Sequence, residues 1–380
     1  MDFKLTEEQE ILKRTVKDFM QKECPREYVR DCDEKEIYPE ELFRKMADLG
    51  WLGLRIPEKY GGSEAGAVDL AVFLENISRG MVTAGQIYYS LYLIGAHYVN
   101  LFGNEDQKAF YLPSLVNNKI RFAFALTEPN AGSDAASLTT SAVVEGDEVI
   151  LNGQKTFITG AKTSDVILVM VRTDKTVEKH QGISMVLMDS RAAGIEYRQL
   201  KKLGQRPLDA YEVFLNEVRI PRKNLLGEWN QGWNQVLKVL DHERFCVALI
   251  YLGGAQAVLE DAVQYAKQRV QFGQPIGKFQ MTKEKLADML VGVEASRLLI
   301  YRTAWMIDEG IPCAREASMA KLFTSETYMR AASKGLQMMG GYGYMMEYDM
   351  QRHFRDAKLG EIGAGSSEIQ RIILARSLGV

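Results

Sequence analysis

The segment RFAFALTEPNAGSD, residues 121–134, marks the place where the pattern of apolar residues changes along the chain. Phe122, Phe124 and Leu126 alternate with small residues, and this period of two is typical of a β-strand. Upstream of this segment, and again beyond about residue 230, apolar residues recur at helical spacing. Helices, then strands, then helices predict an α+β fold in which the two classes are segregated.

The first 120 residues are predicted to form an N-terminal α-helical domain, residues 1–120. Thr6 and Gln9 have the spacing of a capping box, and helical spacing follows. The same spacing recurs in several segments between residues 40 and 102, broken by Pro57 and the Gly61-Gly62 pair.

Residues 121–230 are predicted to form a middle antiparallel β-barrel, because short apolar runs alternate with turn residues. The expected strands include Val143-Val144, Val149 to Leu151, Val166 to Val171, Ile183 to Met188 and Tyr211 to Leu215. Asn152-Gly153 is typical of a hairpin turn.

Residues 231–380 are predicted to form a C-terminal four-helix bundle. Long helical patterns cover 233–269, 280–308, 314–340 and 366–378.

Composition narrows the class of protein. The net charge of -3 argues against a nucleic-acid partner that is held through phosphate neutralisation. The four cysteines are scattered without metal-ligand spacing, so we expect free thiols in a reducing compartment and no metal site. Residues 1–5 are polar and no apolar run approaches 18 residues, so we expect a cytoplasmic protein without membrane insertion.

Three loops contain residues suited to binding an anion or a polar ring. The loop 126–134 combines Pro, Asn, Gly and hydroxyl residues directly after a strand, and a plain turn is the alternative. Residues 269–275 place an Arg and a Phe where a long helix ends, which suits a pyrophosphate or an adenine; a basic helix C-terminus is the alternative. Residues 360–368 form a Gly-rich loop before a helix capped by Ser366 or Ser367, and a structural turn is equally consistent.

Glu243 interrupts an apolar stripe on the predicted helix that begins near Trp233. Its neighbours on that face are Val236, Leu240, Val247, Ile250, Gly254 and Val258. Burial there raises the pKa of a carboxyl group and suits it to abstract a proton. The alternative is a structural Glu that pairs with Arg244 or another basic residue.

Separated motifs occur along the chain in one order: Ile56-Pro57 with Tyr60-Gly61-Gly62, Thr127 to Asp134, Asn152 to Lys155 with Phe157-Ile158-Thr159, Arg269 to Gly273, Gln337 to Gly343, and Arg355-Asp356-Ala357. Together they resemble the acyl-CoA dehydrogenase family over essentially the whole chain. The resemblance implies the three-domain fold described above, FAD as cofactor, a homotetramer, and an electron-transferring flavoprotein as redox partner.

The resemblance also implies roles for individual residues. The flavin ring would lie against Phe124, Leu126, Thr127, Ser133, Phe157 and Thr159. The pyrophosphate and adenine of FAD would be held by Arg269, Phe272, Gln280, Gln337, Gly340 and Gly341, partly from a neighbouring subunit. Ser366 and Glu368 would contact the cofactor as well. Ser133, Asp241, Arg244 and the backbone of Ala364 would contact the CoA thioester.

One position departs from the family pattern. Many members place a catalytic Glu immediately before the glycine of the last loop, where this chain has Ala364. Relatives that carry the base on the long helix resemble the segment 240–244, which implies Glu243 as the catalytic base. Glu243 would take the α-proton while the β-hydrogen leaves as hydride to flavin N5.

Three functions remain open from the sequence. The first is FAD-dependent dehydrogenation of an acyl-CoA, or its reversal by an enoyl-CoA reductase, since segments at 32–40, 241–245 and 269–273 are similar to crotonobetainyl-CoA reductases. The second is an oxidase that passes electrons to oxygen, and the third is a non-catalytic flavoprotein subunit. Residues 84–98 are expected to wall the acyl group, and their aromatic and polar mixture indicates a compact or polar acyl chain; helix packing is the alternative.

Overall fold

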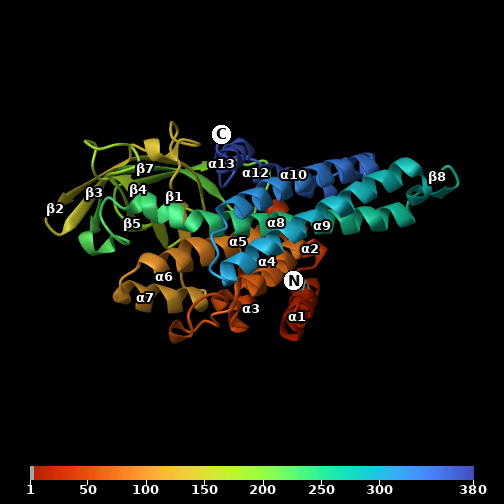
Figure 1. The fold of residues 1–380 in the computed structure, drawn as a ribbon, viewed down its shortest axis with the longest axis horizontal. Coiled ribbons are helices and arrows are strands. Elements are labelled where there is room, and N and C mark those ends of the chain that lie inside the picture. The colour runs from red at the N-terminus through yellow and green to blue at the C-terminus, as the bar shows by residue number, and fades with distance from the viewer. Residues whose placement is uncertain (1–3) are drawn as a thin grey trace.

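The computed structural model describes residues 4–380 and confirms the predicted succession of helices, strands and helices (Figure 1). The sheet lies at one end of the molecule and the tip of the C-terminal bundle at the other, with the N-terminal helices below both in this view. Residues 1–3, on which part of the expectation about the N-terminus depends, lie outside the described residues.

The N-terminal part is helical, as predicted. Its α-helices are α1 (Glu7–Glu23), α2 (Arg26–Lys35), α3 (Glu40–Asp48), α4 (Ala67–Gly80), α5 (Val82–Tyr89), α6 (Tyr98–Phe102) and α7 (Glu105–Val116). The predicted capping box opens α1: the Gln9 N–H donates to Thr6 Oγ1 at 3.3 Å, and the Thr6 N–H donates to Gln9 Oε1 at 3.1 Å. Between α5 and α6 the chain forms a π-helix over Ser90–His97, a widened turn that is frequent at functional sites.

The middle part is one curled sheet. Its strands are β1 (Phe122–Ala125), β2 (Ser141–Glu145), β3 (Glu148–Thr159), β4 (Val166–Arg172), β5 (Ile183–Asp189), β6 (Ile195–Leu200) and β7 (Ala210–Pro221). They lie in the order β1-β4-β2-β3-β7-β6, with β5 paired to β4. The sheet is mixed and not wholly antiparallel, because β1 runs parallel to β4, with Phe122 opposite Val166.

The prediction of a turn at Asn152-Gly153 is wrong. Both residues lie inside β3, and the turn between β2 and β3 uses Gly146, which has a φ of 60°. Gly153 instead lies at an irregularity in the pairing of β3 with β7. A Cβ atom there would lie 2.7 Å from the Cα of Thr140, so close backbone approach explains the glycine.

The C-terminal part consists of long helices. They are α8 (Gly232–Gln268), α9 (Gln280–Asp308), α10 (Ala314–Met339), α12 (Met350–Gly360) and α13 (Ser367–Ser377), with the short α11 (Gly341–Tyr344). Helix α8 crosses the centre of the molecule and packs against α4 on one side and α10 on the other. Helix α8 is long and apolar enough to cross a membrane. However, 72% of its most apolar 18-residue stretch is buried inside the protein, as expected for a helix of the core.

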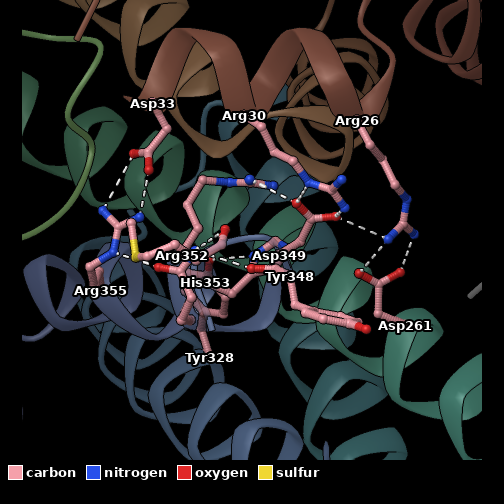
Figure 2. A network of polar contacts seen from close by, with 12 residues as sticks. Arg26, Arg30, Asp33, Asp261, Tyr328, Tyr348, Asp349, Arg352, His353 and Arg355 are labelled. Atoms are coloured by element: carbon pink, nitrogen blue, oxygen red, sulfur yellow. Dashed lines mark hydrogen bonds and ion pairs between the residues drawn. The ribbon is translucent and has the colours of Figure 1, made fainter. Parts of the chain in front are cut away.

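A network of ion pairs joins α2 to α12 and α8 (Figure 2). The buried Asp349 carboxylate accepts from Arg30 Nε at 2.9 Å, from Arg352 Nη1 at 2.9 Å and from Arg26 Nη1 at 3.2 Å. Burial opposes its ionisation, but the guanidinium groups lower the pKa of Asp349 to about 2. The network therefore ties the N-terminal helices to the C-terminal bundle.

Candidate active site

The Glu243 side chain lies on the face of α8 that packs against α5. The Tyr89 hydroxyl donates a hydrogen bond to Glu243 Oε1 at 2.9 Å. Arg244, one of the basic partners that the structural alternative named for Glu243, pairs instead with Asp241, since its Nη1 lies 3.0 Å from Asp241 Oδ1. Asp241 and Arg244, two of the residues predicted to contact the CoA thioester, thus form an ion pair with each other.

The surroundings of Glu243 favour its protonated form. Burial raises the pKa of this carboxyl group, while the Tyr89 hydrogen bond and the charges of Arg244 and Lys321 act in the opposite direction. Protein surrounds the side chain on most sides, although the residue keeps part of its surface open. A carboxylate whose pKa is raised, and which a ligand can reach, accepts a proton readily.

The loop between α12 and α13 presents a free backbone donor. Ala364 adopts a left-handed conformation with a φ of 52°, and Gly365 follows with a φ of 77°. Gln370 Nε2 donates to the carbonyls of Ala364 and Gly365 at 3.2 and 2.9 Å, which fixes the loop. Within residues 4–380, the Ala364 N–H donates to no protein acceptor. It is therefore free to bind a ligand carbonyl.

Lys321, on α10, links this loop to Glu243. The side chain is fully buried, and Nζ donates to the Gly365 carbonyl at 2.7 Å. Burial lowers the pKa of Lys321 to about 8, and the charge of Glu243 opposes that change. The prediction from sequence missed Lys321; the only available signal was a lysine among small residues on the buried face of α10.

The predicted flavin-ring residues gather at the end of β1 and along β3. Phe157 is 70% exposed and has a φ of 59°, a conformation that is rare for a bulky residue. Phe124, Leu126, Thr127 and Thr159 are partly exposed, and Ser133 is exposed. The site thus presents an open aromatic surface beside hydroxyl groups, which fits a planar polar ring.

A buried ion pair fixes the loop 126–134, which contains a hydrogen-bonded turn from Glu128 to Ala131. Lys155 Nζ lies 2.8 Å from Glu128 Oε1 and donates to the Leu126 carbonyl at 3.0 Å. Glu128 also accepts from the Thr139 N–H at 2.7 Å and the Thr140 N–H at 2.9 Å. Although burial opposes ionisation, the Lys155 ammonium and these hydrogen bonds lower the pKa of Glu128 to about 2. This pair was also missed from the sequence.

The predicted pyrophosphate and adenine residues lie at the far tip of the bundle. Arg269 ends α8 before the hairpin of β8 (Val270–Gln271) and β9 (Gln274–Pro275), and its guanidinium lies 5.2 Å from the centre of the Tyr342 ring. Arg269, Gly340, Gly341 and Tyr342 line a cavity of about 510 Å³. The volume and the positive charge fit part of a nucleotide.

Several other predicted cofactor residues lie at or near this tip, where they are open to solvent. Phe272 is 93% exposed and has a φ of 51°. Gln280, the first residue of α9, and Gln337, near the end of α10, are exposed as well. One chain does not bring the tip together with the flavin-ring residues of β3, because β8 and the sheet lie at opposite ends of the molecule (Figure 1).

Ser366 and Glu368 lie at the start of α13, beside Ala364. Ser366, one of the two serines predicted to cap this helix, is the N-cap, and its Oγ accepts from the Ile369 N–H at 3.5 Å. Glu368 is exposed in the first turn of the helix. The four cysteines are free and buried, in agreement with the prediction of free thiols.

Comparison with known families covers all three parts of the chain. Residues 6–119 match the acyl-CoA dehydrogenase N-terminal domain, residues 123–218 the middle domain and residues 230–379 the C-terminal domain. The chain belongs to the acyl-CoA dehydrogenase family. It is therefore a flavoprotein oxidoreductase that acts on CH–CH bonds.

Two relatives and one solved structure show which enzymes the chain is similar to. The chain is 39% identical to a 3-(aryl)acrylate reductase of Clostridium sporogenes, over 98% of this chain and 99% of the relative. It is 35% identical to the CarC subunit of the caffeyl-CoA reductase–Etf complex of Acetobacterium woodii, over 98% of both chains. Butyryl-CoA dehydrogenase from Megasphaera elsdenii superposes with a TM-score of 0.95 at 36% identity and covers 100% of both chains.

Proposed function

We propose that this acyl-CoA dehydrogenase family member moves hydrogen between the α and β carbons of an acyl-CoA and FAD, with Glu243 as the base. The observation that supports this most is the setting of Glu243, which combines a raised pKa, a 2.9 Å hydrogen bond from Tyr89 and partial exposure of the residue. These features suit a carboxylate that takes a proton from carbon, and they argue against a non-catalytic subunit.

In the oxidative direction the chain's own groups act on the thioester. The free Ala364 N–H binds the thioester carbonyl and stabilises the negative charge that develops on its oxygen. Glu243 removes the α-proton, while Tyr89 holds the carboxylate in place. When bound, FAD supplies the acceptor for the hydride that leaves the β carbon. Asp241, Arg244 and Ser133 contact the CoA thioester.

FAD is proposed to span two copies of the chain. Phe157 would hold the flavin ring, and the cavity at Arg269 would hold the nucleotide end of a cofactor bound by another copy, since one chain has these two sites at opposite ends. We therefore propose a homotetramer in which each FAD is held by two subunits. An electron-transferring flavoprotein is proposed as the redox partner, since one relative belongs to such a complex.

The reverse reaction, reduction of an enoyl-CoA, is the second candidate. It is favoured by the reductase names of two relatives that are 39% and 35% identical to the chain. In the reductive direction, the protonated form of Glu243 would donate the proton that the α carbon receives.

A flavin titration tests the proposal and assigns the direction. Purified protein that contains FAD is mixed without oxygen with a panel of acyl-CoAs, and the dithionite-reduced protein with the matching enoyl-CoAs. We expect loss of flavin absorbance with at least one acyl-CoA, or its return with at least one enoyl-CoA. Neither change with any thioester would refute the proposed function, and rapid reoxidation in air would favour an oxidase.

A further inference from the structure

Lys321, on α10, is buried in an unusual setting for a cation. Its side chain is fully buried, and Nζ donates to the Gly365 carbonyl at 2.7 Å. Lys155 is equally buried, but its Nζ lies 2.8 Å from Glu128 Oε1. Within residues 4–380, Lys321 forms no such ion pair. Burial of an ammonium group without a paired carboxylate costs free energy, so packing alone does not explain a lysine at this position.

The contact from Lys321 fixes the turn that carries the free Ala364 N–H. The Gly365 carbonyl accepts from two side chains, Lys321 Nζ at 2.7 Å and Gln370 Nε2 at 2.9 Å. Ala364 has a φ of 52°, a conformation that residues other than glycine rarely adopt, so surrounding contacts must hold it. Donors from α10 and α13 therefore set the direction in which the Ala364 N–H points.

The charge of Lys321 also acts on Glu243. It lowers the pKa of that carboxyl group, in opposition to burial. Burial lowers the pKa of Lys321 itself to about 8, so the ammonium form prevails at neutral pH. The charged groups that act on Lys321 come from three directions: Glu243 and Arg244 on α8, Glu361 at the end of α12, and Glu368 on α13. One buried positive charge thus contacts the turn and influences the base.

We propose that Lys321 is a positioning residue for proton abstraction, which holds the turn that binds the thioester carbonyl and stabilises the negative charge that develops there. The inference rests on the proposed function and deepens it. Removal of the α-proton leaves negative charge on the thioester oxygen, and a fixed cation nearby lowers the free energy of that state. A lysine with a purely structural role would hold the turn without affecting this charge.

A bound 3-oxoacyl-CoA measures this effect without turnover. Its C2 lies between two carbonyl groups, so it ionises to an enolate that absorbs in the near ultraviolet. The ratio of enolate to keto form is measured at neutral pH with saturating 3-oxobutanoyl-CoA on FAD-containing protein. All variants carry Glu243→Gln, so that residue 243 does not take the proton. We expect Lys321→Met to lower the ratio by about tenfold or more, because a unit charge about 10 Å away in partly buried surroundings changes an ionisation equilibrium by that order.

Lys202 offers a matched control outside the site. Its Nζ donates to the Gln205 carbonyl at 2.7 Å, and burial lowers its pKa to about 8, as for Lys321. The carboxylates that act on it are not candidate site residues: Asp356, Asp209, Glu36 and Asp33. Lys202→Met should therefore leave the ratio of enolate to keto form unchanged, even if it lowers stability.

Lys321→Gln separates the charge from the hydrogen bond, because its amide offers a donor to the Gly365 carbonyl. It should lower the ratio as Lys321→Met does, and it replaces that variant if the methionine protein loses FAD. An unchanged ratio in a Lys321 variant that keeps FAD, or an equal fall in Lys202→Met, would overturn the role. Loss of FAD from both Lys321 variants would assign the lysine to folding and would also overturn it.

The proposed function is tested separately by flavin bleaching of the unsubstituted protein. It would survive an unchanged ratio in the Lys321 variants if any acyl-CoA still bleached the flavin or any enoyl-CoA reoxidised it. If no thioester did either, the proposed function itself would fail.

Discussion

Replacement of Lys155 by Met tests how the flavin loop is held. The change leaves the Glu128 carboxylate buried without its cation, and loss of one partner of a buried ion pair costs about 3–5 kcal/mol of stability. Glu128 keeps hydrogen bonds from the Thr139 and Thr140 amides, so we expect a loss near the lower limit, about 3 kcal/mol. We also expect weaker FAD retention, because Leu126 and Thr127 lie in the same loop.

The same loop offers a matched control. Lys179 Nζ lies 2.8 Å from Asp134 Oδ1, but both side chains are about half exposed, so Lys179→Met should change stability little. Both variants are unfolded in urea and followed by circular dichroism, and bound FAD is measured by absorbance after gel filtration. If Lys155→Met were as stable as Lys179→Met and kept its FAD, the buried pair would not hold the loop.

Three further predictions concern the base, the cofactor and the domain junction. Tyr89→Phe removes a hydrogen bond that lowers the pKa of Glu243, so the acidic limb of the pH–rate profile should move to higher pH; an unchanged limb would contradict this role. Arg269→Ala should weaken FAD binding by about tenfold or more, measured by the fluorescence of released flavin, whereas unchanged affinity would place the nucleotide elsewhere. Asp349→Asn leaves Arg30 and Arg352 without their carboxylate partner, while Arg26 keeps Asp261, and should destabilise the protein by about 3 kcal/mol in thermal unfolding; a loss below about 1 kcal/mol would show that the network in Figure 2 adds little.

The long helices were predicted well from the spacing of apolar residues, because that spacing marks the face of a helix that is buried in the core. The pattern at 280–308 coincides with α9, and the apolar stripe around Glu243 lies on α8 as expected. The prediction of a hairpin turn at Asn152-Gly153 was wrong because a contact with another segment, and not a turn, explains the glycine. Gly153 is required by the close approach of Thr140, which directly precedes the paired strand β2, and the Asn-Gly pair itself does not reveal this contact.

The sequence predicted those residues of the candidate site that belong to recognisable motifs. The apolar stripe drew attention to Glu243, and the family resemblance implied the roles of Glu243 and Ala364, whereas neither indicated Lys321 or the Glu128–Lys155 pair. Their roles depend on contacts between elements that are far apart in the sequence. In the sequence alone, each of them resembles an ordinary charged residue on the surface.

Glu243→Gln tests the central claim most directly. The substitution keeps the shape of the side chain but removes its ability to take a proton, so FAD content and thioester affinity should be kept. In anaerobic stopped-flow experiments with a thioester that bleaches the unsubstituted enzyme, we expect the rate of bleaching to fall by at least about 100-fold. A rate within a few fold of that of the unsubstituted enzyme would contradict the assignment of Glu243 as the base.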